Sequence, residues 1–102
     1  MAELTDLPAH TLAAAVRARE ASCREVMRAF LDRIAAVNPR HNAIVSLRDG
    51  DAVLAEAERC DAELARDPSG AATRPFLFGL PQAIKDVVPT AGLRTTFGSP
   101  LF

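Results

Sequence analysis

Apolar residues recur at helical spacing through the first third of the chain. Leu12 and Val16 form an i, i+4 pair in an alanine-rich stretch that follows Pro8, a residue well suited to open a helix. A wider stripe comprises Val26, Met27, Phe30, Leu31, Ile34 and Val37. Ser22 and Glu25 precede this stripe at the spacing of a capping box. The pattern predicts a helical hairpin, with one helix over about 8–19 and a second from Ser22 to a stop at Asn38-Pro39.

Beyond Pro39 the pattern alternates between short β-favouring runs and one further helix. Residues 42–47 are rich in β-favouring residues and are bounded by turn formers, which predicts a strand. A helix is expected over 51–66, with one apolar face formed by Val53, Ala57, Cys60 and Leu64. The apolar run 79–88, between a glycine and a proline, has strand length but contains Lys85 and Asp86.

This order of elements predicts an α/β or α+β fold, in which helices stack on a sheet. Two strands cannot bury three amphipathic helices, so we expect the sheet to be incomplete at residue 102. The chain then divides into the helical hairpin, residues 1–39, and the start of an α/β core, residues 40–102.

The charges and the apolar runs limit the partners. The 12 basic and 13 acidic residues leave a formal charge of −1, so no net field favours nucleic acid or an anionic membrane, and we expect a small-molecule partner instead. No apolar run approaches membrane-spanning length, and the first residues lack the apolar core of a secretory signal. These features predict a cytoplasmic protein.

The cysteines and histidines suggest no metal or redox centre. Cys23 and Cys60 lie far apart within helical patterns, which favours buried free thiols. His10 and His41 have no further ligand at a metal-binding spacing, and no phosphate-binding loop is present. We therefore expect no cofactor.

Lys85 is the one residue whose position in the pattern invites a chemical role. Strand alternation places Lys85 and Asp86 on opposite faces, so Asp86 is not its obvious counter-ion. If the lysine faced the interior, desolvation would lower its pKa and let it accept a proton near neutral pH. The pattern by itself favours the alternative, a solvated lysine at a sheet edge.

The segment around Lys85 is very similar to a motif of the amidase signature family. The resemblance runs through GLPQAIKDVVPTAGLRTTFGS and matches the family at Gly79, Pro81, Lys85, Asp86, Gly92, Thr95, Thr96, Gly98 and Ser99. Gln82 departs from the small or apolar residue more common there. The upstream helices resemble the family's N-terminal region in order and register, so the likeness covers nearly the whole chain.

The resemblance implies that residues 1–102 are the N-terminal part of a single amidase-signature domain, with a large mixed β-sheet covered by helices. It implies carboxamide hydrolysis by a Ser–cis-Ser–Lys triad, in which Lys85 accepts a proton from the bridging serine. Both serines are expected outside this chain, so these residues alone should be inactive. Ser99 is expected to have a structural role, as are Gly92, Gly98, Thr95 and Thr96, with the glycines in turns.

Two other functions stay open. The chain resembles, less closely at its GLRTTFGSPLF end, the amidase subunit of a tRNA-dependent amidotransferase, which releases ammonia from glutamine for a partner subunit. It is also compatible with a non-catalytic helical module that docks on a partner or self-associates as a homodimer through apolar helix faces.

Overall fold

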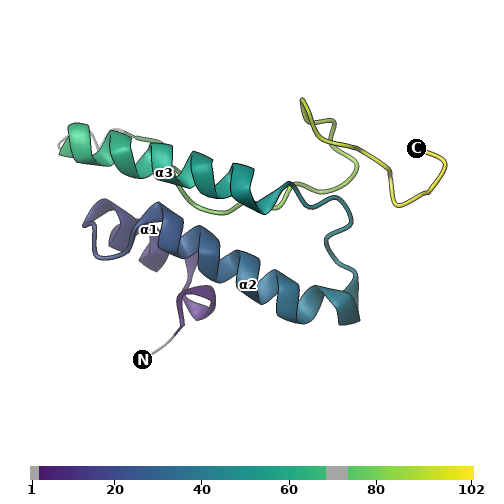
Figure 1. Cartoon of the computed structure of the whole chain (residues 1–102), viewed down its shortest axis with the longest axis horizontal. Helices are drawn as coiled ribbons and strands as arrows, with labels where there is room; N and C mark the ends of the chain where they lie inside the picture. Colours follow the sequence, from purple (N-terminus) through teal and green to yellow (C-terminus); the bar gives the residue numbers. More distant parts are fainter. Residues whose placement is uncertain (1–2, 69–73) are drawn as a thin grey trace.

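The chain folds as a group of helices followed by an extended segment. The computed structural model describes residues 3–68 and 74–102. Within these ranges lie a short 3₁₀ turn, η1 (Leu4–Asp6), and the helices α1 (Ala9–Arg17), α2 (Cys23–His41) and α3 (Gly50–Arg66). Figure 1 shows α2 and α3 side by side, with the chain from residue 74 onward running back along the helices and then leaving them toward the C-terminus.

The predicted α/β fold class is wrong for this chain, because the described residues contain helices but no β-strand. The first predicted strand, 42–47, is a loop. The backbone N–H of Ile44 donates to the side-chain oxygen of Asn38 at 2.9 Å, and its C=O accepts from the Asn38 amide at 3.0 Å. This pairing occupies the two groups that a neighbouring strand would have to bind.

The second predicted strand, 79–88, is an extended stretch bounded by turns. The N–H of Leu80 donates to the C=O of Leu77 at 3.0 Å, and the N–H of Val88 donates to that of Lys85, also at 3.0 Å. A strand needs a second extended segment that exchanges backbone hydrogen bonds with it, and no such segment lies in residues 3–68 or 74–102. The apolar composition of the run was therefore a poor guide to its conformation.

Helix α1 is shorter than the predicted 8–19. Pro8 caps the helix from outside it, and its C=O accepts from Thr11 at 3.0 Å and Leu12 at 3.1 Å. At the other end Arg19 adopts a left-handed conformation with φ 60°, and the N–H of Glu20 donates to the C=O of Ala15 at 2.9 Å. This turn ends the helix as a left-handed glycine usually does, here at an arginine.

The start of α2 has all its backbone donors satisfied. The predicted capping box is confirmed: Ser22 Oγ accepts from the N–H of Glu25 at 3.0 Å, and Glu25 Oε1 accepts from the N–H of Ser22 at 3.3 Å. The two N–H groups between them, of Cys23 and Arg24, donate to the carboxylate of Asp61 on α3 at 2.7 and 3.1 Å. A negative charge at a helix N-terminus also complements the helix dipole, so Asp61 joins the two helices.

The predicted stop of α2 at Asn38-Pro39 is wrong by a few residues. The helix continues through Pro39 to His41 and ends at Asn42, which is left-handed with φ 49°. Pro39 has no N–H to donate, so one helical hydrogen bond is missing in this last turn.

The core lies among the three helices and receives one residue from the extended segment. The buried cluster comprises Leu12, Ala13, Val16, Ala21, Cys23, Val26, Ala57, Leu64 and Leu80. The apolar face predicted for α3 is confirmed, since Val53, Ala57 and Leu64 are buried and Cys60 is half-buried. No helix in the described part of the chain is long and apolar enough to cross a membrane.

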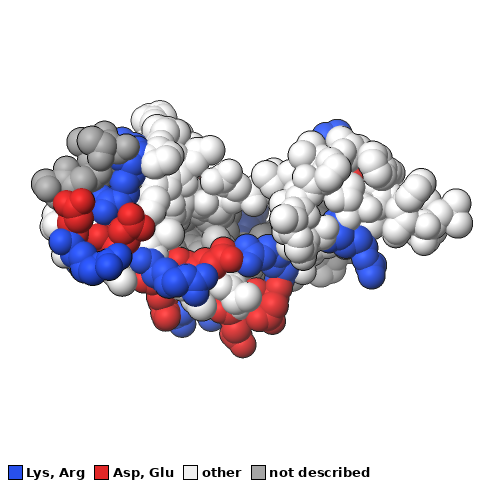
Figure 2. All heavy atoms as spheres, turned by 90° about the horizontal axis from the view of Figure 1, so that it is seen from above, with Lys and Arg blue, Asp and Glu red and all other residues white. Residues whose placement is uncertain are grey.

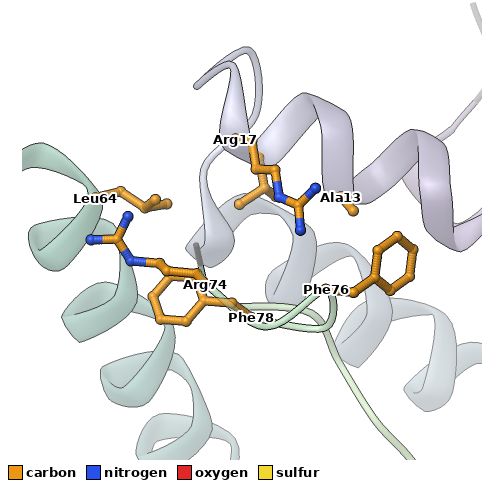
Figure 3. Close-up of a pocket in the computed structure, with 7 residues that line it drawn as sticks. Ala13, Arg17, Leu64, Arg74, Phe76 and Phe78 are labelled. Carbon is orange, nitrogen blue, oxygen red and sulfur yellow. The ribbon is translucent and has the colours of Figure 1, made fainter. Parts of the chain in front are cut away.

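Residues 74–80 fasten the extended segment to the helices. The guanidinium of Arg74 donates to the C=O of Glu63 at 3.3 Å and of Asp67 at 3.1 Å, and so caps the C-terminal end of α3. The same group lies 5.3 Å from the centre of the Phe78 ring. Figure 3 shows these side chains around a small cavity of about 10 Å³ between α1, α3 and residues 74–78. Such a space holds a single water at most.

Candidate functional site

Lys85 lies in the extended stretch that leaves the core at Leu80. Leu80 is buried, whereas residues 82–85 are exposed, so the stretch is held at its beginning and solvated further on. The lysine side chain is exposed and forms no ion pair with any residue that the structure describes. The structure thus presents Lys85 as an unpaired amine on the surface, and not on the interior face of a strand.

Asp86 binds a loop ten residues further along the sequence. Its carboxylate accepts from the backbone N–H of Thr96 at 2.8 Å, from the Thr96 hydroxyl, and from the N–H of Gly98 at 3.3 Å. Its backbone C=O accepts from the N–H of Phe97 at 3.0 Å. The Thr96 hydroxyl, followed by the N–H groups of Thr96 and Gly98, lowers the pKa of Asp86, because these donors stabilise the carboxylate.

Sequence reasoning missed this role of Asp86. It gave Thr95 and Thr96 a structural role without pairing either with Asp86, whereas the Thr96 hydroxyl donates to the Asp86 carboxylate. Asp86 and Thr96 both lie in the motif that resembles the amidase signature family, but no rule of local spacing pairs them. The motif did contain one indication of this contact, because an aspartate can accept hydrogen bonds from several N–H and O–H donors of one turn.

Gly92 and Gly98 lie in turns, as predicted. Gly92 and Gly98 have φ angles of 78° and 74°, in the left-handed region that glycine adopts readily. Ser99 takes part in a local turn, in which its Oγ accepts from the N–H of Leu101 at 3.2 Å. The structure therefore gives Ser99 a place in this turn and no hydrogen bond with Lys85.

A shallow hollow of about 320 Å³ lies beside this loop. It is lined by Val45, Arg94, Thr96, Gly98, Ser99, Pro100 and Phe102. Arg94 carries the one full charge on its wall, and Lys85 is not among the lining residues. The described residues hence bring the lysine together with neither this hollow nor a serine.

The two cysteines are structural. Cys23 is fully buried, and burial, followed by its contact with the Asp61 carboxylate, raises the pKa of its thiol to about 12. Burial also raises the pKa of Cys60. Because the thiolate is the reactive form, neither residue is a nucleophile at neutral pH. The prediction of free thiols is confirmed, with Cys60 only half-buried.

Metal ligands do not gather in the described residues. His10 and His41 are both exposed, and no group of three or more His, Cys, Asp or Glu side chains in residues 3–68 and 74–102 could hold a metal ion. These histidines are surface residues of α1 and of the end of α2.

The chain belongs to the Amidase family, whose family model matches residues 25–102. This range contains α2, α3, Lys85 and the loop bound by Asp86. The expected family membership is thereby confirmed. No solved structure matches the chain.

Among curated proteins the chain is similar to the A subunit of glutamyl-tRNA(Gln) amidotransferase from several bacteria. It is 46% identical to that of Acidothermus cellulolyticus over 101 residues, which are 99% of this chain and 19% of the relative. It is 41% identical to that of Pelobacter propionicus over 97 residues, or 95% of this chain and 19% of the relative. The chain therefore spans about a fifth of the length of these relatives.

Proposed function

We propose that these residues contribute the proton acceptor, Lys85, to an enzyme that hydrolyses carboxamides. The supporting observation is that the family match includes a lysine whose amine is exposed and free of ion pairs among the described residues, on a segment fixed at Leu80 and Asp86. An accessible lysine is one of the side chains that serve as a general base in catalysis.

In the proposed reaction, the neutral amine of Lys85 takes a proton from a bridging serine, which takes one from a nucleophilic serine. The nucleophile attacks the amide carbonyl, and as the C–N bond breaks, the protonated Lys85 returns its proton through the bridging serine to the leaving amine. Water then hydrolyses the acyl-enzyme to the carboxylic acid. Both serines are proposed to lie outside this chain, because its described serines make no contact with Lys85.

The test is Lys85→Ala in a full-length protein that contains this segment. Removal of the base should lower kcat for amide hydrolysis by about 10²–10⁴-fold. Arg33→Ala is the matched control, since Arg33 is an exposed cation on α2 without an ion pair among the described residues, and it should leave kcat unchanged. The 102-residue chain should show no amidase activity, and hydrolysis by it that Lys85→Ala abolishes would overturn the placement of the serines.

A more specific proposal is that the amide is glutamine and that the released ammonia passes to a partner subunit. The names of the relatives from Acidothermus cellulolyticus and Pelobacter propionicus favour it. They weigh against a stand-alone amidase, which the GLRTTFGSPLF end of the chain resembles more closely. Those names also include a tRNA. The near-zero net charge of this chain therefore does not exclude nucleic acid as a partner of the whole assembly.

The two activities differ in what they need. An amidotransferase subunit should hydrolyse glutamine and co-purify with a partner protein, whereas a stand-alone amidase should hydrolyse simple amides without a partner. Assays of both substrates before and after partner removal separate them. In either case we place the protein in the cytoplasm and propose a small-molecule amide as its substrate.

A further inference from the structure

We propose that Asp86 is a positioning residue for Lys85, which it serves by holding the loop 96–98 against the backbone next to the lysine. This inference rests on the proposed function for its catalytic meaning, but its structural basis is independent of it. The carboxylate neither touches substrate nor transfers a proton. It acts through the conformation of its neighbour.

The loop depends on Asp86 for its place in the molecule. In residues 94–102, three successive backbone N–H groups, those of Thr96, Phe97 and Gly98, donate to Asp86, and the Thr96 hydroxyl does so as well. Among the described residues, every hydrogen bond from 94–102 to the rest of the protein ends on Asp86. Within residues 3–68 and 74–102, the hydrogen bonds that attach this segment therefore all depend on one residue.

The conformation of the loop shows that it does not form from local preference alone. Phe97 has a φ of 54°, in the left-handed region that is unfavourable for a residue with a side chain, and Gly98 follows at 74°. The N–H groups of Thr96 and Gly98, on either side of Phe97, donate to the Asp86 carboxylate, and that of Phe97 donates to the Asp86 backbone C=O. These hydrogen bonds offset the strain at Phe97.

The same arrangement determines the surroundings of Lys85. Its C=O accepts from the N–H of Val88 at 3.0 Å, so Asp86 lies inside a tight turn that begins at the lysine. The contacts of Asp86 with the loop fix that turn from outside. They also occupy the carboxylate, which forms no ion pair with the adjacent ammonium in the described structure.

The structural test is amide hydrogen exchange in the 102-residue chain. Asp86→Ala should speed exchange at the amides of Thr96 and Gly98 by about tenfold or more, because their carboxylate acceptor is lost. Thr96→Val, the gentler change, should do so less, and Thr96→Ser should restore protection. Thr95→Val is the matched control and should change nothing, since the Thr95 side chain forms no hydrogen bond within the described residues. Unchanged exchange in Asp86→Ala would overturn the attachment.

The catalytic test uses the full-length protein. Asp86→Ala and Thr96→Val should lower kcat by about tenfold to a hundredfold, the effect of a displaced catalytic group, with little change in KM. Thr96→Ser should recover kcat. If Lys85→Ala abolishes activity while Asp86→Ala leaves kcat intact, the positioning role is wrong and the proposed function stands. If Lys85→Ala is fully active, the proposed function fails, and the exchange data still decide the attachment.

Discussion

The molecule has a helical part, residues 3–68, and an extended part, residues 74–102. The two parts differ in how many of their apolar side chains are buried. All the buried apolar residues except Leu80 belong to the helical part, whereas all the exposed large hydrophobic residues except Val45 and Leu47 belong to the extended part. In Figure 2 charged side chains gather over the helices, and the lobe formed by the C-terminal residues is largely uncharged.

The difference follows from where the backbone hydrogen bonds go. A helix satisfies its own N–H and C=O groups and needs only one apolar face covered, which α1, α2 and α3 do for one another. The extended part has no such internal ladder and depends on particular contacts, at Arg74, Gly79, Leu80 and Asp86. The contacts that join or order the two parts are therefore the places where substitutions should have the clearest effects.

The largest effect is expected at Gly79, where the extended part lies against α2 and α3. A Cβ on this residue would lie 2.4 Å from the sulfur of Cys23, which is fully buried and cannot move aside, and 3.8 Å from Cys60 Cβ. Gly79 also has a φ of 75°. Gly79→Ala should lower the free energy of unfolding by about 2–5 kcal/mol, from overpacking plus left-handed strain. Urea denaturation measures it.

Gly92→Ala is the matched control for the steric part of this effect. Gly92 has a similar φ of 78°, but nothing lies within 4 Å of the position of its added Cβ. The substitution should cost only the strain, about 1–2 kcal/mol, and that strain falls on the loop and not on the core. If both variants lowered the free energy of unfolding equally, close packing of Gly79 against the helices would not contribute to stability.

A smaller effect is expected at Asp61, which joins helices within the helical part. Asp61→Ala leaves the N–H groups of Cys23 and Arg24 without their acceptor at the start of α2. The free energy of unfolding should fall by about 1–3 kcal/mol, as for other lost hydrogen bonds to a charged group. Thermal denaturation followed by circular dichroism measures this loss.

The control for Asp61 is an aspartate whose charge faces solvent. Asp32 forms only an exposed i, i+4 ion pair with Arg28 at 3.8 Å, and Asp32→Ala should change stability by about 0.5 kcal/mol or less. A loss at Asp61 no greater than that at Asp32 would contradict its role as the cap of α2.

The smallest effect is the pH dependence of the loop in the extended part. The pKa of Asp86 is held below its ordinary value of 3.8 by the Thr96 hydroxyl and by the N–H groups of Thr96 and Gly98. Its contribution to order is therefore fully present above pH 3.8 and is lost as the pH falls through the lower, folded-state pKa. Amide shifts of Thr96 and Gly98, followed by NMR in acid, should give a midpoint below 3.8.

Thr96→Val should raise that midpoint toward the ordinary value, because it removes the largest cause of the shift, whereas Thr95→Val should not move it. A wild-type midpoint at or above 3.8 would show that the carboxylate does not hold the loop.

Local sequence rules were reliable where a residue acts on its near neighbours. The capping box of Ser22 and Glu25 and the apolar face of α3 are as predicted, because both depend on spacings within one helix. The rules failed for 42–47 and 79–88, since β propensity describes residues that suit a sheet and does not supply the neighbouring strand. Near Ile44 the side chain of Asn38 takes the hydrogen bonds instead.

The candidate site also has features that the sequence predicted and features that it did not. The motif around Lys85 was enough to find the family and the lysine, and the family match confirms the first of these. That Asp86 binds Thr96 and Gly98 could not be read from spacing, because the contact depends on how the intervening turns fold back. Nor could the position of Gly79 against Cys23, which joins residues 56 positions apart in the sequence.

The order of the residues was thus enough to predict the helices, the capping box and the apolar faces, and to find the family to which the chain belongs. These properties depend on hydrogen bonds and side-chain spacing within a few residues, or on a contiguous motif. Only the folded arrangement established that the run around Lys85 is not a strand, that Asp61 caps a helix other than its own, and that Asp86 holds the loop beside the lysine. Each of these depends on groups distant in sequence, whose approach is set by the packing of the whole molecule.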